Sequence, residues 1–259
     1  MDVFEEYIEL SDNPNSDRHM EAVYRSSLCA LNLYHKDAEY RIDAFIERYP
    51  ESVYVQGALW AIADHHYKRR HFKKAAEAFD LVNLRKLSKN LQRELRFKRG
   101  HSLFEEGDYE KARYDLFEVM KKDGPFLEPS TYYFSHIAYI NGKPQVALEG
   151  FEAIADHPDF KGLVPVYIAQ TMHATQQYDR LKTYGSNLLE KASGIDEDMR
   201  TEIARLVGDA FYKSQDFAGA SPFLEMAWKG TRGPGRKAEF GYQVAVSYKH
   251  LTLPTICSV

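Results

Sequence analysis

One local pattern recurs along the chain every 34 to 39 residues, and this repetition limits the fold more than any other feature of the sequence. The pattern is clearest in GDYEKA at residues 107–112, where a Gly-Asp turn is followed by an aromatic residue and then by an alanine three residues later. The anchor positions equivalent to that alanine are Ala38, Ala75, Ala112, Ala147, Leu181 and Ala220.

Other residue types recur at fixed distances from the anchors and so form columns when the units are aligned. Twelve residues before each anchor stands a small residue, and one further period adds a seventh: Ser26, Ala63, Gly100, Ser135, Ala169, Gly208 and Ala245. Positions four and seven residues after the anchors are apolar, except for Gly185. Small residues let two helices approach closely, and apolar residues at these spacings form one helical stripe. The columns therefore predict a series of helical hairpins.

Turn residues and prolines mark the ends of these hairpins. Phrases such as EGDY (106–109) and NGKP (141–144) separate the two helices of a unit. We expect Pro165 in a first helical turn, and Pro222 to kink its helix or delay the start of that helix. Four further prolines are expected to close second helices: Pro14, Pro50, Pro125 and Pro158.

These units resemble tetratricopeptide (TPR) repeats over nearly the whole chain. The run RYPESVYVQGALWAIADHHYKRRHFKKAAEAF (48–79) is similar to the YP-S-Y-x-x-A-L form of bacterial cell-envelope TPR proteins, of the TolA-binding coordinator and outer-membrane assembly lipoprotein type. The resemblance implies an all-α fold, namely an α-solenoid of helix-turn-helix hairpins forming a right-handed superhelix. Two arginines, Arg25 and Arg99, occupy columns that are usually apolar, and Leu181 and Gly185 suggest a less regular fifth unit.

The register divides the chain into six whole units and two partial ones. We expect a lone second helix at 1–14, whole TPR units at 15–50, 51–88, 89–125, 126–158, 159–194 and 195–235, and a lone first helix at 236–249. Residues 250–259 read as a non-native tail that resembles translated sequencing-adapter read-through. The partial ends lead us to expect a fragment of a longer chain.

The overall composition and charge give no sign of nucleic-acid or membrane binding, with one local exception. The net charge of −4 gives no bulk attraction for nucleic acid or membranes. No apolar run is long enough to span a bilayer, and two cysteines are too few for a disulfide framework. The local exception is residues 68–99, with twelve basic residues against three acidic ones. This segment is either a solvated face or a surface that binds an anionic ligand.

The sequence offers no catalytic constellation. Phosphate-binding, serine-hydrolase and HExxH motifs are absent, and we expect paired carboxylates such as those at 196–198 to cap helices. His65 and His66 point about 100° apart on a helix, and His71 adds no i, i+4 pair. We therefore expect no enzyme activity, no cofactor and no metal site.

The candidate functional residues lie on the first helices of the units, which line the concave face in the TPR resemblance. Aromatic residues recur there with His, Asp and Arg among them, a composition suited to holding a peptide. The predicted partner-binding residues are Trp60, Asp64, Tyr67, Lys68, Phe97, His101, Phe104, Tyr132, His136, Tyr139, Gln170, His173, Arg205, Asp209 and Tyr212. The alternative is that many of these rings pack between adjacent helices.

These observations favour a noncatalytic scaffold that binds a protein or peptide partner, with no small-molecule substrate. By resemblance alone, the periplasm or cell envelope is the expected compartment. One alternative is a cytoplasmic regulatory module whose basic segment 68–99 binds an acidic ligand or nucleic acid. Another is that the repeats space a catalytic domain beyond the given ends.

Overall fold

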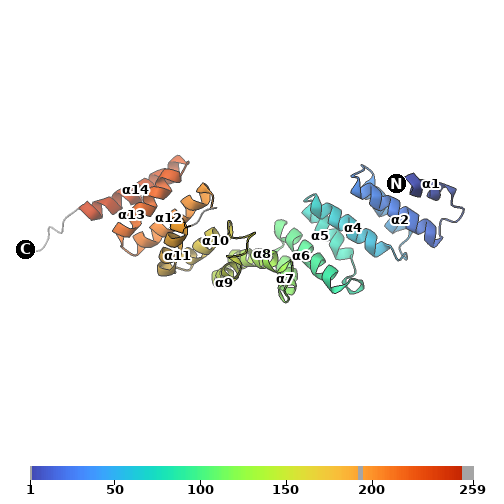
Figure 1. The fold of residues 1–259 in the computed structure, drawn as a ribbon, viewed down its shortest axis with the longest axis horizontal. Coiled ribbons are helices and arrows are strands. Elements are labelled where there is room, and N and C mark those ends of the chain that lie inside the picture. Colours follow the sequence, from blue (N-terminus) through green and yellow to red (C-terminus); the bar gives the residue numbers. More distant parts are fainter. Residues whose placement is uncertain (1, 192–194, 253–259) are drawn as a thin grey trace, which may run out of the picture. The chain divides into compact units, whose positions relative to one another are not determined.

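A computed structural model describes residues 2–191 and 195–252, and within these ranges every regular element is a helix (Figure 1). The elements follow in chain order: α1 (Asp2–Leu10), α2 (Asp17–Asn32), α3 (Ala38–Arg48), α4 (Val55–Lys68), α5 (Phe72–Leu81), the short 3-10 helix η1 (Leu84–Lys86), α6 (Lys89–Glu105), α7 (Tyr109–Met120), α8 (Leu127–Ile140), α9 (Pro144–Ile154), α10 (Val164–Ala174), α11 (Tyr178–Lys191), α12 (Glu197–Lys213), α13 (Phe217–Gly230) and α14 (Pro234–Thr252).

The helices form two compact units, residues 1–133 and 134–259, which we call unit 1 and unit 2. Each unit is a run of antiparallel helix pairs joined by short turns. Each expected whole repeat contains a first and a second helix, from α2 and α3 to α12 and α13. The exact repeat boundaries stay a prediction. The predicted tail lies outside the described residues from 253 onward, and α14 continues through Thr252.

The predicted columns form the core of both units. All six anchors are at most 1% exposed, and the first six residues of the small column are buried. Ala245, the seventh, is exposed. The residues four positions after the anchors are also buried, from Ile42 in α3 to Leu224 in α13. This arrangement confirms the all-α architecture of stacked helical hairpins.

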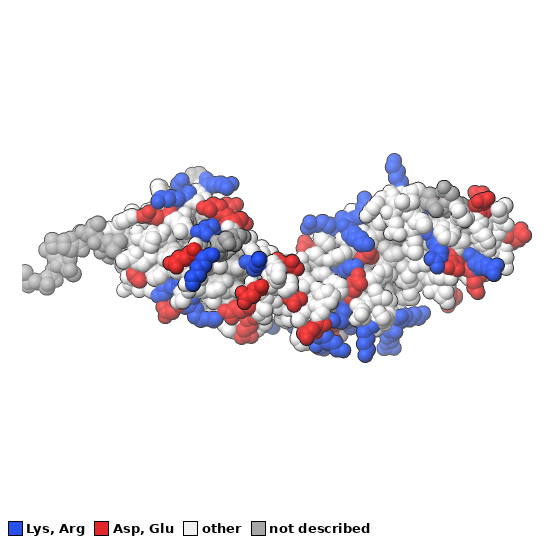
Figure 2. Space-filling model, in the orientation of Figure 1, with Lys and Arg blue, Asp and Glu red and all other residues white. Residues whose placement is uncertain are grey.

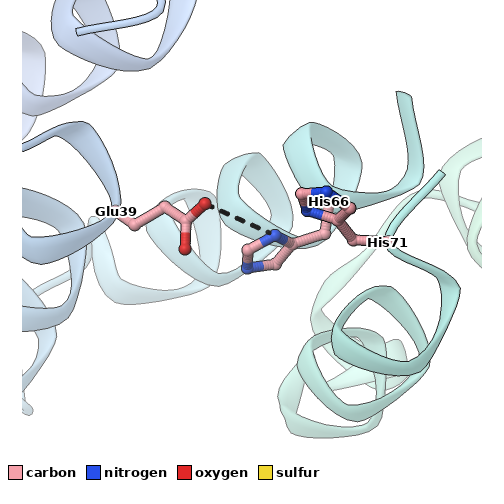
Figure 3. Close-up of side chains that lie close together, drawn as sticks. All are labelled: Glu39, His66 and His71. Carbon is pink, nitrogen blue, oxygen red and sulfur yellow. Dashed lines mark ion pairs between the residues drawn. The ribbon is translucent and has the colours of Figure 1, made fainter. Parts of the chain in front are cut away.

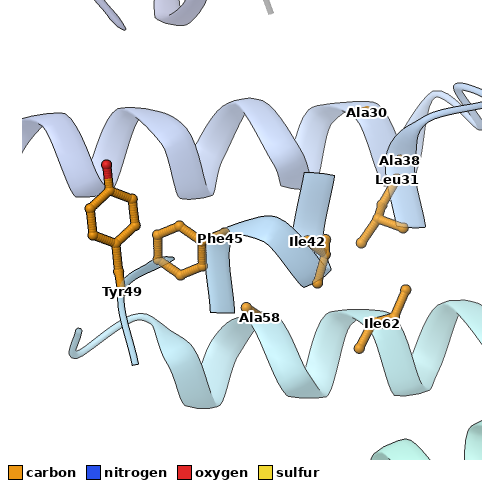
Figure 4. Packing of buried hydrophobic residues seen from close by; sticks show 8 residues of the cluster. All are labelled: Ala30, Leu31, Ala38, Ile42, Phe45, Tyr49, Ala58 and Ile62. Atoms are coloured by element: carbon orange, nitrogen blue, oxygen red, sulfur yellow. The ribbon is translucent and has the colours of Figure 1, made fainter. Parts of the chain in front are cut away.

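Figure 4 shows how one set of columns packs in unit 1. Side chains of α3 lie between α2 and α4, with Ile42 and Phe45 at most 1% exposed. Burying large apolar side chains of this kind contributes roughly 1.5 to 3 kcal/mol each relative to exposure. The cluster comprises Ala30, Leu31, Ala38, Ile42, Phe45, Tyr49, Ala58 and Ile62.

Close approach of helices explains the glycines in these columns. A Cβ atom added to Gly208 would lie 2.8 Å from Cδ2 of Leu224 and 3.1 Å from its backbone nitrogen. At Gly185 a Cβ would meet Cγ2 of Val207, so the gap in the apolar column of α11 is filled from α12. The fifth unit therefore compensates for its missing side chain with one from the next helix.

Each first helix from α2 to α12 ends in the same turn, in which one residue adopts positive φ. In the turn after α4, Arg70 has φ 59° and the next N–H, that of His71, donates to the carbonyl of His66 at 2.9 Å. This is the Schellman arrangement, which satisfies a helix-terminal carbonyl. The positive-φ residues are Tyr34, Arg70, Gly107, Gly142, Gln176 and Gln215.

The prolines follow most of the expectations. Pro14, Pro50, Pro125 and Pro158 each lie beyond the end of a second helix, and Pro165 lies in the first turn of α10. Pro222 is different, because α13 begins at Phe217 and runs through it. Pro222 therefore does not delay the start of the helix.

Candidate partner-binding surface

The first helices of unit 1 are linked side chain to side chain across successive repeats. Lys98 of α6 donates to Asp64 of α4 at 2.5 Å, and its ammonium lies 5.7 Å from the centre of the Trp60 ring. Lys68 pairs with the same carboxylate at 2.8 Å. Burial alone would raise the pKa of Asp64, but hydrogen bonds from Lys68 and Lys98 lower it below its ordinary value.

A second link joins α4, α6 and α8 through His101. Its Nδ1 lies 2.8 Å from the hydroxyl of Tyr67, its Nε2 lies 3.2 Å from Glu105, and its ring stacks on Tyr133 with centroids 4.4 Å apart. Burial is the main cause that lowers the pKa of His101 and that raises the pKa of Tyr67 to about 12. The predicted column of aromatic residues is thus part of an interhelical network.

Beside these links lies a groove with a volume of about 450 Å³, which we call the unit-1 groove. Its walls come from α2 and α4, with residues of the segment leading into α6 at one end. The lining combines apolar and aromatic side chains with five polar ones, Asn32, Gln56, Asp64, His65 and Lys68. The full set is Tyr24, Leu28, Leu31, Asn32, Tyr34, Gln56, Gly57, Trp60, Ala61, Asp64, His65, Lys68, Leu87 and Leu91.

Unit 2 carries polar links at equivalent positions. His173 of α10 contacts Asp209 of α12 at 2.6 Å, and Lys213 reaches the same carboxylate at 2.9 Å. Burial alone would raise the pKa of Asp209, but hydrogen bonds from His173 and Lys213 lower it. One helical turn earlier, Gln170 donates to Glu202, which also pairs with Arg205. This face is therefore rich in charges that are already paired.

The predicted site residues are mostly half-buried. Only Lys68 and Tyr139 among the fifteen are exposed, and none of the fifteen is fully buried. The structure brings Trp60, Asp64 and Lys68 together at the unit-1 groove. Phe97 stacks on Phe126 rather than lining this groove. Four other predicted residues make ring contacts: Phe104 with Tyr109 and Tyr133, Tyr132 with Tyr133, His136 with Phe151 and Tyr167, and Tyr212 with Phe217. Tyr139 is exposed at the end of α8.

Sequence reasoning missed several residues of this surface. Tyr133 stands one position after Tyr132, so a search for exact columns passes over it although its ring is central to the His101 network. Tyr24 and Leu28 belong to the first repeat, for which no face residues were named. Projecting the Trp60 column back by one period to Val23 would have directed attention to this part of α2.

Half of the basic residues in segment 68–99 make ion pairs or hydrogen bonds within the fold, and the other half are exposed. Arg96 and Arg99 both pair with Asp115, which has 2% of its side chain exposed, and Lys74 pairs with Glu39. Arg93 donates to backbone carbonyls at the end of α7. Figure 2 shows both acidic and basic side chains on the drawn face of each unit, with basic side chains grouped along the lower edge of unit 1.

Comparison with known proteins supports the fold. The sequence matches no established protein-family profile and no curated protein. Solved structures match over most of the chain, and the fold they share is that of a helical solenoid of TPR type. A tetratricopeptide repeat protein from Parabacteroides merdae is 14% identical, with a TM-score of 0.57, and the match covers 89% of this chain and 91% of that one.

Two further structures are similar. PilF of Pseudomonas aeruginosa is 18% identical with a TM-score of 0.54, covering 86% of this chain and 97% of that one. BtubC from P. vanneervenii is 17% identical with a TM-score of 0.52, covering 94% and 96%. The described helices include none that is both long and apolar enough to cross a bilayer.

Proposed function

We propose that this chain is a noncatalytic protein-interaction scaffold that holds a peptide segment of a partner in the unit-1 groove. The observation that carries the proposal is the groove itself, about 450 Å³ in volume, lined by Trp60 together with the charged side chains of Asp64 and Lys68. Aromatic anchors in concave surfaces supply much of the affinity of protein interfaces. A peptide lying there would place apolar side chains against Tyr24, Leu28 and Leu91.

The scaffold reading is also supported by the repeat architecture. A solenoid presents extended surfaces built from successive repeats, which suits it to binding other chains. The buried cluster of α2, α3 and α4 holds the two walls of the groove together, and Lys98 holds the carboxylate of Asp64, so the groove is largely preformed. A preformed surface loses less conformational entropy on binding. The bacterial cell-envelope setting implied by the sequence resemblance is part of this proposal.

A displayed library of random peptides tests the groove. Selection on the whole chain is expected to yield peptides that bind the wild type and lose at least about tenfold in affinity with Trp60→Ala, because a central aromatic anchor contributes 2 kcal/mol or more. The matched control is Tyr40→Ala, which removes a 75% exposed aromatic side chain from the second helix α3. Peptides that bind Trp60→Ala as well as the wild type would contradict the proposal.

A further inference from the structure

The structure brings three potential metal ligands together that are far apart in the sequence. Glu39 lies in the first turn of α3, His66 near the end of α4, and His71 at the residue before α5. Their ligand atoms all lie within 4.8 Å of one another. Figure 3 shows the carboxylate of Glu39 facing the imidazole of His66, with His71 on the following turn.

The turn after α4 explains how His66 and His71 meet. The Schellman turn with Arg70 at positive φ reverses the chain, and the N–H of His71 donates to the carbonyl of His66 at 2.9 Å. The two imidazole rings therefore lie 6.1 Å apart between centroids. A spacing of five residues brings two side chains together here because the helix has ended between them.

His66 is placed as a metal ligand should be. The residue is 6% exposed, and its Nδ1 is buried, makes no hydrogen bond within the described residues, and lies 3.9 Å from Oε1 of Glu39. A buried polar atom without a hydrogen bond is costly, and a bound cation would remove that cost.

We propose that Glu39, His66 and His71 bind a divalent transition-metal ion of the zinc type. Two imidazoles and one carboxylate are ligands that zinc prefers, and in a tetrahedral site with bonds of about 2.0 to 2.2 Å they lie roughly 3.3 Å apart. The ligand atoms, now within 4.8 Å of one another, would have to move closer to reach this spacing. Water would fill the fourth position. The bound ion would join the hairpin of α3 to the hairpin of α4 and α5.

Lys74 competes with a metal ion for the carboxylate of Glu39. Its ammonium lies 3.1 Å from Oε2 of Glu39, so a cation must compete with it for the carboxylate. The lysine side chain is 58% exposed and can swing into solvent. The proposal therefore makes an unusual prediction, namely that removing a basic side chain that is not a ligand strengthens metal binding. His65, whose Nε2 lies 4.0 Å from Oε1 of Glu39, is a neighbour outside the ligand set.

Calorimetric titration of the whole apo chain with zinc tests the site. We expect one ion per chain in the wild type, about tenfold or more weaker binding in Glu39→Gln and His71→Ala, and several-fold tighter binding in Lys74→Met. The two weakening changes affect half-exposed and exposed residues, so the fold is expected to survive, and circular dichroism checks this. His157→Ala is the matched control, because His157 also lies 3.9 Å from a carboxylate, that of Asp159.

Tryptophan fluorescence gives a readout independent of affinity. Trp60 lies on α4 in unit 1 and Trp228 on α13 in unit 2. Zinc should raise the unfolding midpoint reported by Trp60 in Trp228→Phe, and Glu39→Gln should abolish that rise. Absence of zinc binding by the wild type, equal binding by wild type and Glu39→Gln, or a loss as large in His157→Ala would overturn the proposal.

Discussion

Residues at positive φ are the most regular structural feature of the repeats, although the sequence uses several residue types for them. Gly107 has φ 81°, and a Cβ added there meets nothing within 4 Å. Gln176 and Gln215 adopt similar angles with side chains that strain the backbone. The hairpin therefore imposes the turn geometry, and glycine is the residue that adopts it with the least conformational strain.

This gives a prediction for backbone strain. Gly107→Ala should lower the free energy of unfolding by about 1 kcal/mol, because alanine must adopt the left-handed conformation. Gln215→Gly should raise it by up to about 1 kcal/mol, since relief of strain exceeds the added entropy of the unfolded chain. Thermal unfolding followed by circular dichroism measures both.

The control for that pair is Gly233→Ala. A Cβ at Gly233 also meets nothing within 4 Å, and its φ lies outside the left-handed range. Equal losses of stability in Gly107→Ala and Gly233→Ala would show that strain at the turn is not the cause.

The histidine at position 136 predicts a dependence of stability on pH. Burial lowers the pKa of His136 to about 4, whereas an unfolded histidine titrates near 6.5. The unfolded chain therefore binds the proton more tightly, so this contribution is fully present above pH 6.5 and is lost as the pH falls from 6.5 to about 4.

Replacing His136 should flatten the pH profile. Between pH 7.5 and 4.5, the free energy of unfolding of His136→Phe should fall by less than that of the wild type, with a difference on the order of 2 kcal/mol. Urea titrations at the two pH values provide the measurement, with His157→Phe as the control because 35% of its side chain is exposed. Parallel profiles for wild type and His136→Phe would count against a buried neutral imidazole.

Pairs of helices hold together through polar as well as apolar contacts. Asp115 of α7 has only 2% of its side chain exposed, and it accepts hydrogen bonds from Arg96 and Arg99 of α6. This explains why Arg99 occupies a column that is usually apolar. The buried pair links the two helices of one repeat.

Removing that carboxylate should be costly. Asp115→Ala removes the buried carboxylate that two largely buried guanidinium groups share, and leaves Arg99 only its pair with the exposed Asp80. We therefore expect a loss of about 3 kcal/mol in the free energy of unfolding. Chemical denaturation measures the loss. The variant Arg96→Met, Arg99→Met, Asp115→Leu removes all three charges together and should recover much of the stability. A triple variant no more stable than Asp115→Ala would refute this account.

At the scale of the whole molecule, the effect of a substitution on stability should depend on how far away a repeat lies along the chain. In a solenoid each repeat contacts its neighbours, so a local defect acts most strongly on nearby repeats. Gly208→Ala forces a Cβ against Leu224 in unit 2, at an expected cost of about 1 to 3 kcal/mol. The chain has two tryptophans, Trp60 in unit 1 and Trp228 in unit 2, and each can report on its own unit.

We therefore expect Gly208→Ala to lower the urea midpoint reported by Trp228 more than that reported by Trp60. Single-tryptophan variants, Trp60→Phe and Trp228→Phe, separate the two signals. Equal shifts of both transitions would mean that the chain unfolds as one cooperative body.

The sequence by itself determined the helical hairpins, because small and apolar residues at fixed spacings are local information that only one packing of helices satisfies. The buried anchors and the close approach at Gly208 follow directly from those columns. Sequence periodicity also located the helices that carry the candidate surface. It could not tell which rings would line a groove, since Trp60 and Phe97 share a column and differ in their neighbours.

Tertiary structure alone decided which distant side chains meet. Glu39 and His66 belong to neighbouring hairpins and meet where these hairpins pack. His71 reaches His66 because the turn after α4 reverses the chain, and no regular helical spacing relates the two residues. An i, i+4 rule applies within a continuous helix, so it gave no sign of this cluster. The physical reason is that repeat spacing records which residues face inward, whereas contacts between side chains depend on how the hairpins are rotated against one another.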